Sequence, residues 1–218
     1  DGSEPKELAG ALMGLFGPDT ESFTKDTAIM TCTTGENGAF AFENIPYGHF
    51  IVAEIESPAL YTVSPERHHV YIGTDGQVIT IRVDNTLIRG SVQVIKTEAV
   101  AEPSAVENTN ENTFMRFLSG AEFALYEDTN ENKEFDSGDK QVGKLSETDS
   151  GYHTAENLLA GGYFIKERKA PKGYIQDEKA YYFAIETDGQ VAVIENGEKG
   201  RGFTNEAFRG NLKIVKDS

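Results

Sequence analysis

Residues 161–174 read GGYFIKERKAPKGY, a run of alternating side chains followed by turn-forming residues. In a β-strand successive side chains point to opposite faces, so Tyr163, Ile165 and Glu167 share one face. The proline and glycine of the following APKG segment cannot prolong the strand, because proline removes a backbone donor and glycine favours a turn. The stretch therefore predicts a strand that carries a carboxyl group toward a hydrophobic core and ends just after it.

A looser copy of this stretch occupies residues 48–58, GHFIVAEIESP, and places Glu54 on the face of an aromatic and an aliphatic side chain. Glu54 and Glu167 lie 113 residues apart, and the same spacing separates the glycines of two TDGQV segments, Gly76 and Gly189. A register kept over such a length is typical of duplicated domains. The chain is therefore expected to hold two related domains.

Short alternating runs separated by Gly, Asp, Asn and Pro predict an all-β fold of two tandem antiparallel sandwiches of the immunoglobulin-like kind. In the first half such runs include residues 38–42, 61–63 and 78–83. The expected organisation is a first sandwich at 1–87, a second at 88–208, and an isolated strand at 209–218. That last strand begins a following domain or is donated to another molecule.

Other strands also carry polar side chains on an apolar face. Lys96 follows Val92 and Val94 in the segment RGSVQVIK, and Lys216 ends the matching segment RGNLKIVK. Asn85 and Asn205 follow apolar residues in the same alternating way. An amine, a carboxyl and a carboxamide are thus predicted to face one core, where each alone would be costly to bury.

Burial dictates what such groups do to one another. Desolvation lowers the pKa of a lysine and raises the pKa of a glutamic acid, so a neutral amine and a neutral acid coexist at ordinary pH. The amine can then add to the asparagine amide while the acid stabilises the developing charge and relays a proton to the leaving ammonia. The predicted product is an isopeptide bond between lysine and asparagine, made in a single turnover without a cofactor.

Several motifs together resemble the B-type repeat of Gram-positive collagen adhesins and the prealbumin-like domains of sortase-assembled pilins. They occupy segments 90–96, 120–125, 163–167, 170–174 and 203–205. The resemblance implies that Lys96 is the amine donor, Asn205 the acceptor and Glu167 the catalyst. It also implies an extracellular, cell-wall protein that serves as a pilin or adhesin stalk beside neighbouring domains or subunits.

The first domain departs from this pattern. Glu54, as catalyst, and Asn85 are present, but the first strand and its lysine should precede Asp1, and Lys6 lies in the turn after that strand. Lys216 is then either the lysine of a third domain or the partner of Asn85 in another molecule.

One acidic segment, DTNENKEFDSGD, has the oxygen spacing of a calcium loop. Lys133 takes the position usual for glycine, and an aspartate replaces the bidentate glutamate, so a solvated acidic turn is the alternative reading. The candidate ligands are Asp128, Asn130, Asn132, Glu134, Asp136 and Asp139.

Composition narrows the classes of partner. A formal net charge of −16 argues against nucleic acid, and no apolar run is long enough to span a bilayer, so no membrane contact is expected. The single cysteine, Cys32, is expected to be a small buried hydrophobe. The alternative function is a binding module that presents loops such as 97–117 to a host matrix protein or glycan. An enzyme acting on an external substrate ranks last, because no exposed nucleophile and base are found.

Overall fold

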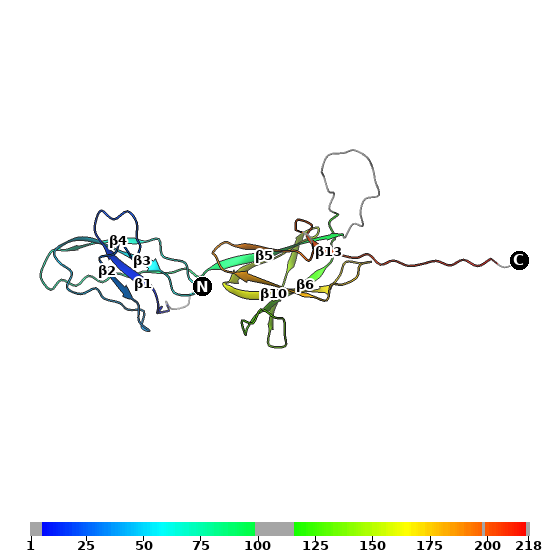
Figure 1. Ribbon diagram of the computed structural model, residues 1–218, viewed down its shortest axis with the longest axis horizontal. Coiled ribbons are helices and arrows are strands. Elements are labelled where there is room, and N and C mark those ends of the chain that lie inside the picture. The colour runs from blue at the N-terminus through cyan, green and yellow to red at the C-terminus, as the bar shows by residue number, and fades with distance from the viewer. Residues whose placement is uncertain (1–5, 99–115, 198, 217–218) are drawn as a thin grey trace, which may run out of the picture. The chain divides into compact units, whose positions relative to one another are not determined.

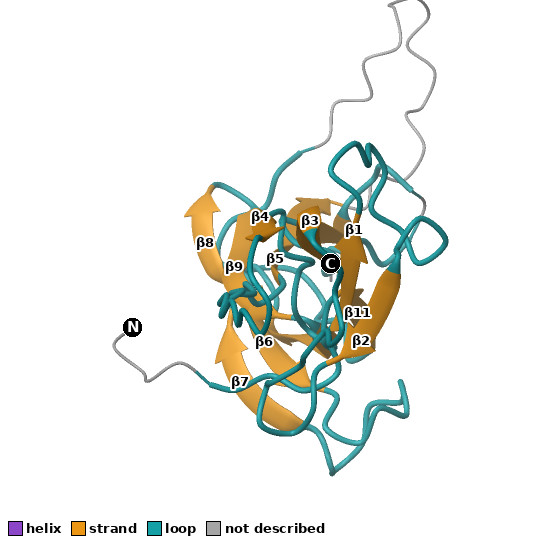
Figure 2. Ribbon diagram, turned by 90° about the vertical axis from the view of Figure 1, so that its left-hand side faces the viewer, coloured by secondary structure: helices purple, strands orange, loops and turns teal. Residues whose placement is uncertain are grey.

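The computed structural model describes residues 6–98, 116–197 and 199–216. The chain divides between Ile88 and Arg89 into two compact units, called unit 1 and unit 2 in chain order. Every regular element among the described residues is a strand, as Figure 2 shows. The predicted all-β class of tandem sandwiches is confirmed, and no described segment forms a helix that could cross a membrane.

Unit 2 contains two packed sheets. One has the order β11-β10-β6-β7 and the other the order β12-β5-β9-β8, with β13 also paired to β5. Their bounds are β5 (Arg89–Glu98), β6 (Glu122–Glu127), β7 (Lys140–Lys144), β8 (Ser146–Asp149), β9 (Tyr152–Leu159), β10 (Gly161–Lys169), β11 (Ala180–Ile185), β12 (Val191–Ile194) and β13 (Phe203–Asn205).

The central strand of the second sheet is β5, which pairs antiparallel with β9 and parallel with both β12 and β13. Figure 1 shows β13 near the end of β5. Its alternation matches the prediction, because Val92, Val94 and Lys96 are buried while the residues between them are partly exposed. Gly202 lets β13 come close: it has a φ of 74°, and a Cβ there would lie 2.5 Å from the Ile95 carbonyl oxygen.

Unit 1 has one sheet, of order β2-β1-β3-β4. Its strands are β1 (Leu12–Phe16), β2 (Met30–Thr33), β3 (Gly48–Glu56) and β4 (Arg67–Ile72). Met13, Leu15, Phe50 and Val52 form its core, against which partly buried side chains of the opposite layer pack. The described residues of unit 1 therefore form one complete sheet. The segments that pack against it as a second layer make no ladder of strand-to-strand hydrogen bonds.

Three predicted strands of unit 1 are wrong. Residues 38–42 and 78–83 form no strand, and of 61–63 only Tyr61 makes an isolated bridge, to Leu87. The physical reason is visible in unit 2, where the strands corresponding to 39–46 and 78–81 are β9 and β12, and both pair with β5. The described part of unit 1 contains no counterpart of β5, so the alternating pattern has no ladder to join.

Two smaller expectations also need correction. Cys32 lies in β2 and is partly exposed, not a core residue, because β2 is an edge strand of its sheet. The lysine strand runs on to Glu98, two residues beyond Lys96, and Thr97 is buried, so the predicted loop begins later than 97. The remainder of that loop, 99–115, lies outside the described residues.

Candidate functional site

Lys96 is brought to the site by β5 and is fully buried, at 0% exposure. Because β13 runs parallel to β5 with Phe203 opposite Lys96, the lysine Nζ donates to the Phe203 carbonyl oxygen at 2.7 Å. The Phe203 ring centroid lies 5.2 Å from the same nitrogen. Desolvation in this setting lowers the pKa of Lys96 to about 8.

Glu167 lies near the end of β10, where the alternation predicted it, and is also 0% exposed. Its Oε2 accepts the backbone N–H of Asp177 at 2.8 Å and the Asn205 side-chain amide at 2.9 Å. Desolvation raises the pKa of Glu167, and these hydrogen bonds together with the nearby Lys96 oppose part of that rise. The carboxyl group is therefore held toward its neutral form.

Asn205 ends β13 and is buried beside Glu167. At this site Oδ1 of Asn205 and Oε1 of Glu167 are buried and find no hydrogen-bond partner among the residues that the structure describes. Unpaired buried acceptors are costly, and they sit here on two side chains that already share one hydrogen bond. The structure thus brings Glu167 into direct contact with Asn205. The Lys96 amine contacts the backbone carbonyl of Phe203, two residues before that asparagine.

Aromatic rings surround these groups. The Phe203 ring makes edge contacts with the rings of Phe123 and Tyr181, with centroids 5.1 and 5.2 Å away. Such packing leaves little room for water, which strengthens electrostatic interactions among the three polar groups and accounts for the shifted pKa values.

A further hydrogen-bond network, which the sequence did not predict, supports this site. The Asp177 carboxylate accepts the Tyr181 hydroxyl at 2.7 Å and the Asn196 amide at 3.0 Å. Asn196 in turn bonds both the N–H and the carbonyl oxygen of Thr204, at 2.7 and 2.8 Å, which fixes β13. The only sequence signal was the longer connection before Asn205, seven residues longer than the one before Asn85, because Asn196 lies within it.

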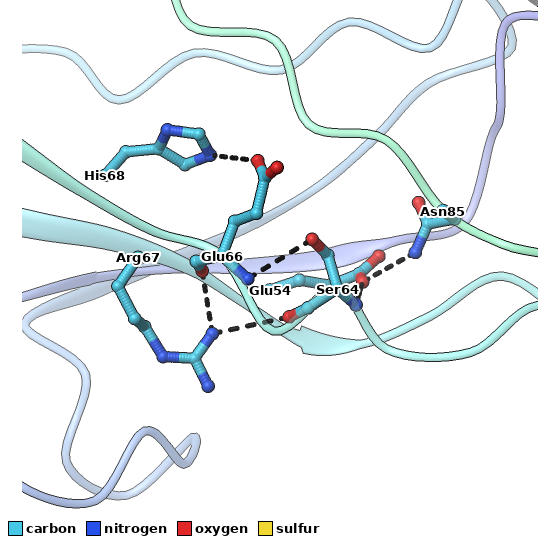
Figure 3. Close-up of polar contacts among 6 residues, drawn as sticks. All are labelled: Glu54, Ser64, Glu66, Arg67, His68 and Asn85. Carbon is cyan, nitrogen blue, oxygen red and sulfur yellow. Dashed lines mark hydrogen bonds and ion pairs between the residues drawn. The ribbon is translucent and has the colours of Figure 1, made fainter.

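Unit 1 repeats the acid and the amide without the amine. Glu54 is buried and its Oε2 accepts the Ser64 N–H at 2.5 Å and the Asn85 amide at 2.7 Å, as Figure 3 shows. Glu54 Oε1 has no hydrogen-bond partner within the described ranges. The two lysines of unit 1, Lys6 and Lys25, are exposed and lie outside its strands. The described part of unit 1 therefore holds an incomplete copy of the site.

The acidic loop after β6 is ordered by its own hydrogen bonds. Asp128 is buried and accepts the N–H groups of Asn132 and Lys133, while Asp136 accepts the side-chain amides of Asn130 and Asn132. Lys133 adopts a φ of 61°, the left-handed conformation that the usual glycine would take. Within the described ranges, no three His, Cys, Asp or Glu side chains are grouped so as to hold a metal.

Calcium binding by this loop stays a prediction from the sequence. We expect calorimetry to record heat release when millimolar calcium is titrated into the chain. The Asp128→Asn variant should release no heat, because that change removes a charge from the first ligand position. A flat calorimetric titration of the unsubstituted chain would contradict the calcium site and favour the solvated turn.

Most of the chain matches one protein family. The model described as "SpaA: Prealbumin-like fold domain" matches residues 1–87 and 105–199. Among solved structures, the Bacillus anthracis TIE protein superposes with a TM-score of 0.66 at 22% identity over 93% of this chain. This chain spans 31% of the length of that protein, so the likeness concerns the fold of one part of it.

Two pilus proteins are also similar at lower TM-scores. The minor pilin GBS52 of Streptococcus agalactiae has a TM-score of 0.37 and 17% identity, covering 98% of this chain and 89% of that one. A C-terminal fragment of the pilus adhesin SpaC from Lactobacillus rhamnosus GG has a TM-score of 0.46 and 15% identity, with coverages of 95% and 91%. No curated protein matches the chain. Because the family model matches well over half of its residues, this chain belongs to the family of SpaA prealbumin-like fold domains.

Proposed function

We propose that this chain is part of a Gram-positive surface stalk or pilin whose unit 2 locks itself with an isopeptide bond between Lys96 and Asn205. The observation that carries the proposal is the burial of an amine, an acid and an amide in one aromatic site, with the acid bonded to the amide. Membership of the SpaA prealbumin-like family supports the structural role and an extracellular, cell-wall location. Its partners are then neighbouring domains or subunits of the same surface assembly.

The reaction needs no external reagent. Lys96 Nζ adds to the side-chain carbon Cγ of Asn205, forming the new C–N bond, and the bond from Cγ to Nδ2 breaks. The proton lost by the amine passes through Glu167 to Nδ2, which leaves as ammonia. A proton on Glu167 Oε1 would also supply a donor for Asn205 Oδ1, the oxygen on which negative charge develops.

The bond would stabilise unit 2 by restricting its unfolded chain. Joining Lys96 to Asn205 closes a loop of about one hundred residues, and by analogy with disulfides such a closure contributes roughly 4–5 kcal/mol in the chain-entropy model. Such a link suits an extracellular stalk in which the one cysteine cannot form an internal disulfide.

Intact mass of the purified chain tests the proposal. We expect a mass about 17 Da below that of the sequence, the mass of one ammonia, and a branched peptide joining Lys96 to Asn205 after digestion. Lys96→Arg keeps a positive charge but lacks the primary amine, so its mass should equal the sequence mass. A full sequence mass for the folded, unsubstituted chain would overturn the proposal.

The rate of bond formation should depend on pH in a bell shape. The reactive pair holds one proton, on Glu167, while Lys96 is neutral, so it has the same protonation count as the ion pair. At low pH the pair of Lys96 and Glu167 binds a second proton, and the protonated amine can no longer attack. Above the Lys96 pKa of about 8 the pair loses its one proton, so no acid remains to protonate the leaving group.

The bell shape can be measured on chain recovered unfolded from inclusion bodies and refolded at set pH, by following the 17 Da loss. The rate should fall about tenfold per pH unit once the pH is well above 8. A rate that keeps rising to pH 10 would show that Glu167 does not act as an acid.

A further inference from the structure

Asp177 lies in the connection between β10 and β11 and contacts the site through its backbone. Its N–H donates to Glu167 Oε2 at 2.8 Å, the same oxygen that accepts the Asn205 amide at 2.9 Å. The side-chain amide of the preceding residue, Gln176, donates to the Glu167 carbonyl oxygen at 3.0 Å. The connection therefore holds both the carboxyl group and the backbone of the acid.

The side chain of Asp177 extends this hold to the strand that carries the amide. Its Oδ2 accepts Asn196 Nδ2 at 3.0 Å, and the same nitrogen donates to the Thr204 carbonyl oxygen at 2.8 Å. Asn196 Oδ1 accepts the Thr204 N–H at 2.7 Å, and Thr204 directly precedes Asn205 in β13. One residue thus links the acid to the acceptor strand. Such placement matters because a shift of about 1 Å can slow a reaction by roughly a hundredfold.

The described part of unit 1 repeats only the backbone half of this arrangement. At the spacing of 113 residues that separates Glu54 from Glu167, Ser64 takes the place of Asp177, and its N–H donates to Glu54 Oε2 (Figure 3). The Ser64 hydroxyl instead accepts the N–H of Glu66. A backbone contact found in both units belongs to their shared framework, whereas the Asp177 carboxylate is an addition in unit 2.

Asp177 also brings a negative charge to the site. Burial alone would raise its pKa, but hydrogen bonds from two side chains and one backbone N–H outweigh burial and lower the pKa, so the carboxylate stays ionised. Desolvation is the main cause of the raised pKa of Glu167, and the Asp177 charge adds to that rise. The same charge opposes the lowering of the Lys96 pKa by desolvation. An anion beside the pair of Lys96 and Glu167 therefore lets the pair keep its one proton to higher pH.

The titratable groups around this pair come from four strands and one connection. Desolvation lowers the pKa of His153 on β9, which is therefore neutral at alkaline pH. Desolvation and the hydrogen bond to Asp177 raise the pKa of Tyr181 on β11, which therefore keeps its proton. The remaining groups are Lys96 on β5, Glu167 on β10, and Asp177 and Lys179 in the connection. A change at alkaline pH after substitution of Asp177 can thus be assigned to its charge.

We propose that Asp177 is a positioning residue for the condensation of Lys96 with Asn205. It holds Glu167 and the Thr204 backbone in one arrangement, and its charge keeps the shared proton in the site at alkaline pH. The inference rests on the function proposed for unit 2 and adds the group that sets the placement of the reactants and the pH range of the reaction.

Refolding of whole-chain variants at set pH, followed by the 17 Da loss, tests the two roles separately. Asp177→Ala removes both the link to Asn196 and the charge, and it should slow condensation at least about tenfold at pH 7. Asp177→Asn keeps an oxygen for the Asn196 amide, so it should regain most of that rate at pH 7. At pH 9 it should fall several-fold behind the unsubstituted chain, because loss of the charge moves the alkaline limb of the bell to lower pH.

Two further variants serve as controls. Asn196→Ala breaks the link without changing a charge, so it should be slower by the same factor at pH 7 and at pH 9. Glu178→Gln removes an exposed carboxylate next to Asp177 in the chain and should follow the unsubstituted protein at both pH values. Circular dichroism of the same samples shows that each variant is folded while its mass is followed.

The outcomes separate this inference from the function proposed for unit 2. A full sequence mass for the folded, unsubstituted chain would overturn the proposed bond itself. Where that chain loses 17 Da, an equal rate for Asp177→Ala would overturn the positioning role, as would an equal rate for Asn196→Ala. An Asp177→Asn rate in fixed ratio to that of the unsubstituted chain from pH 7 to pH 9 would overturn the role of the charge.

Discussion

Glu167→Gln should have the full mass of its own sequence, without the loss of about 17 Da expected for the unsubstituted protein, and should be much less stable to heat. Glutamine has the same shape and keeps an oxygen that can accept the Asp177 N–H, so unit 2 is expected to fold. It cannot relay a proton from Lys96 to the leaving group, and ammonia should therefore not be released. The unfolded state then regains the freedom that the cross-link removes.

The size of the effect follows from loop closure. Loss of roughly 4–5 kcal/mol in a domain of this size should lower Tm by roughly 15–20 °C, measured by differential scanning calorimetry. The matched control is Glu54→Gln, which makes the same change in unit 1 and should leave the 17 Da loss of unit 2 intact. A Glu167→Gln chain that still lacks 17 Da would show that Glu167 is not required.

Under tension, unit 2 should not lengthen. Force enters β5 from the unit 1 side and leaves through the chain after Asn205, so a bond between Lys96 and Asn205 carries the load past the body of the domain. Without the bond, the 109 residue steps between them would extend by roughly 370 Å at about 3.4 Å per residue. Single-molecule pulling of the chain measures this difference directly.

The comparison for this experiment is Lys96→Arg, which keeps a cation but has no primary amine. That variant should show the additional extension of unit 2. Unit 1 should open in both proteins, and its opening identifies the records in which a single molecule was stretched. An extension of about 370 Å from unit 2 in the unsubstituted chain would contradict a bond at this position.

Much of the site was predictable because it depends on local alternation. Lys96, Glu167 and Asn205 each follow apolar residues at a period of two, and the structure buries all three. Burial of one polar side chain by such a pattern has many explanations, whereas three with complementary chemistry suggest a reaction.

What the sequence did not reveal depends on contacts made at long range. Residues 39–46 and β9 have similar patterns, yet only β9 forms a strand, because it alone has β5 beside it. Asp177 and Asn196 sit in connections without periodicity, and their roles arise only when Thr204 is brought beside them. A local pattern indicates which face a residue would take, but it cannot supply the neighbour that makes the ladder.

The parallel pairing of β5 with β13 affects the mechanical resistance of unit 2 independently of any covalent link. Because the load enters at the start of one strand and leaves from the end of its parallel neighbour, traction acts along the strands and strains their hydrogen bonds together in shear, not one after another by peeling. Unit 2 under load would then keep the Lys96 amine and the Asn205 amide close together without help from a covalent link. The topology by itself would in this way give the domain mechanical resistance.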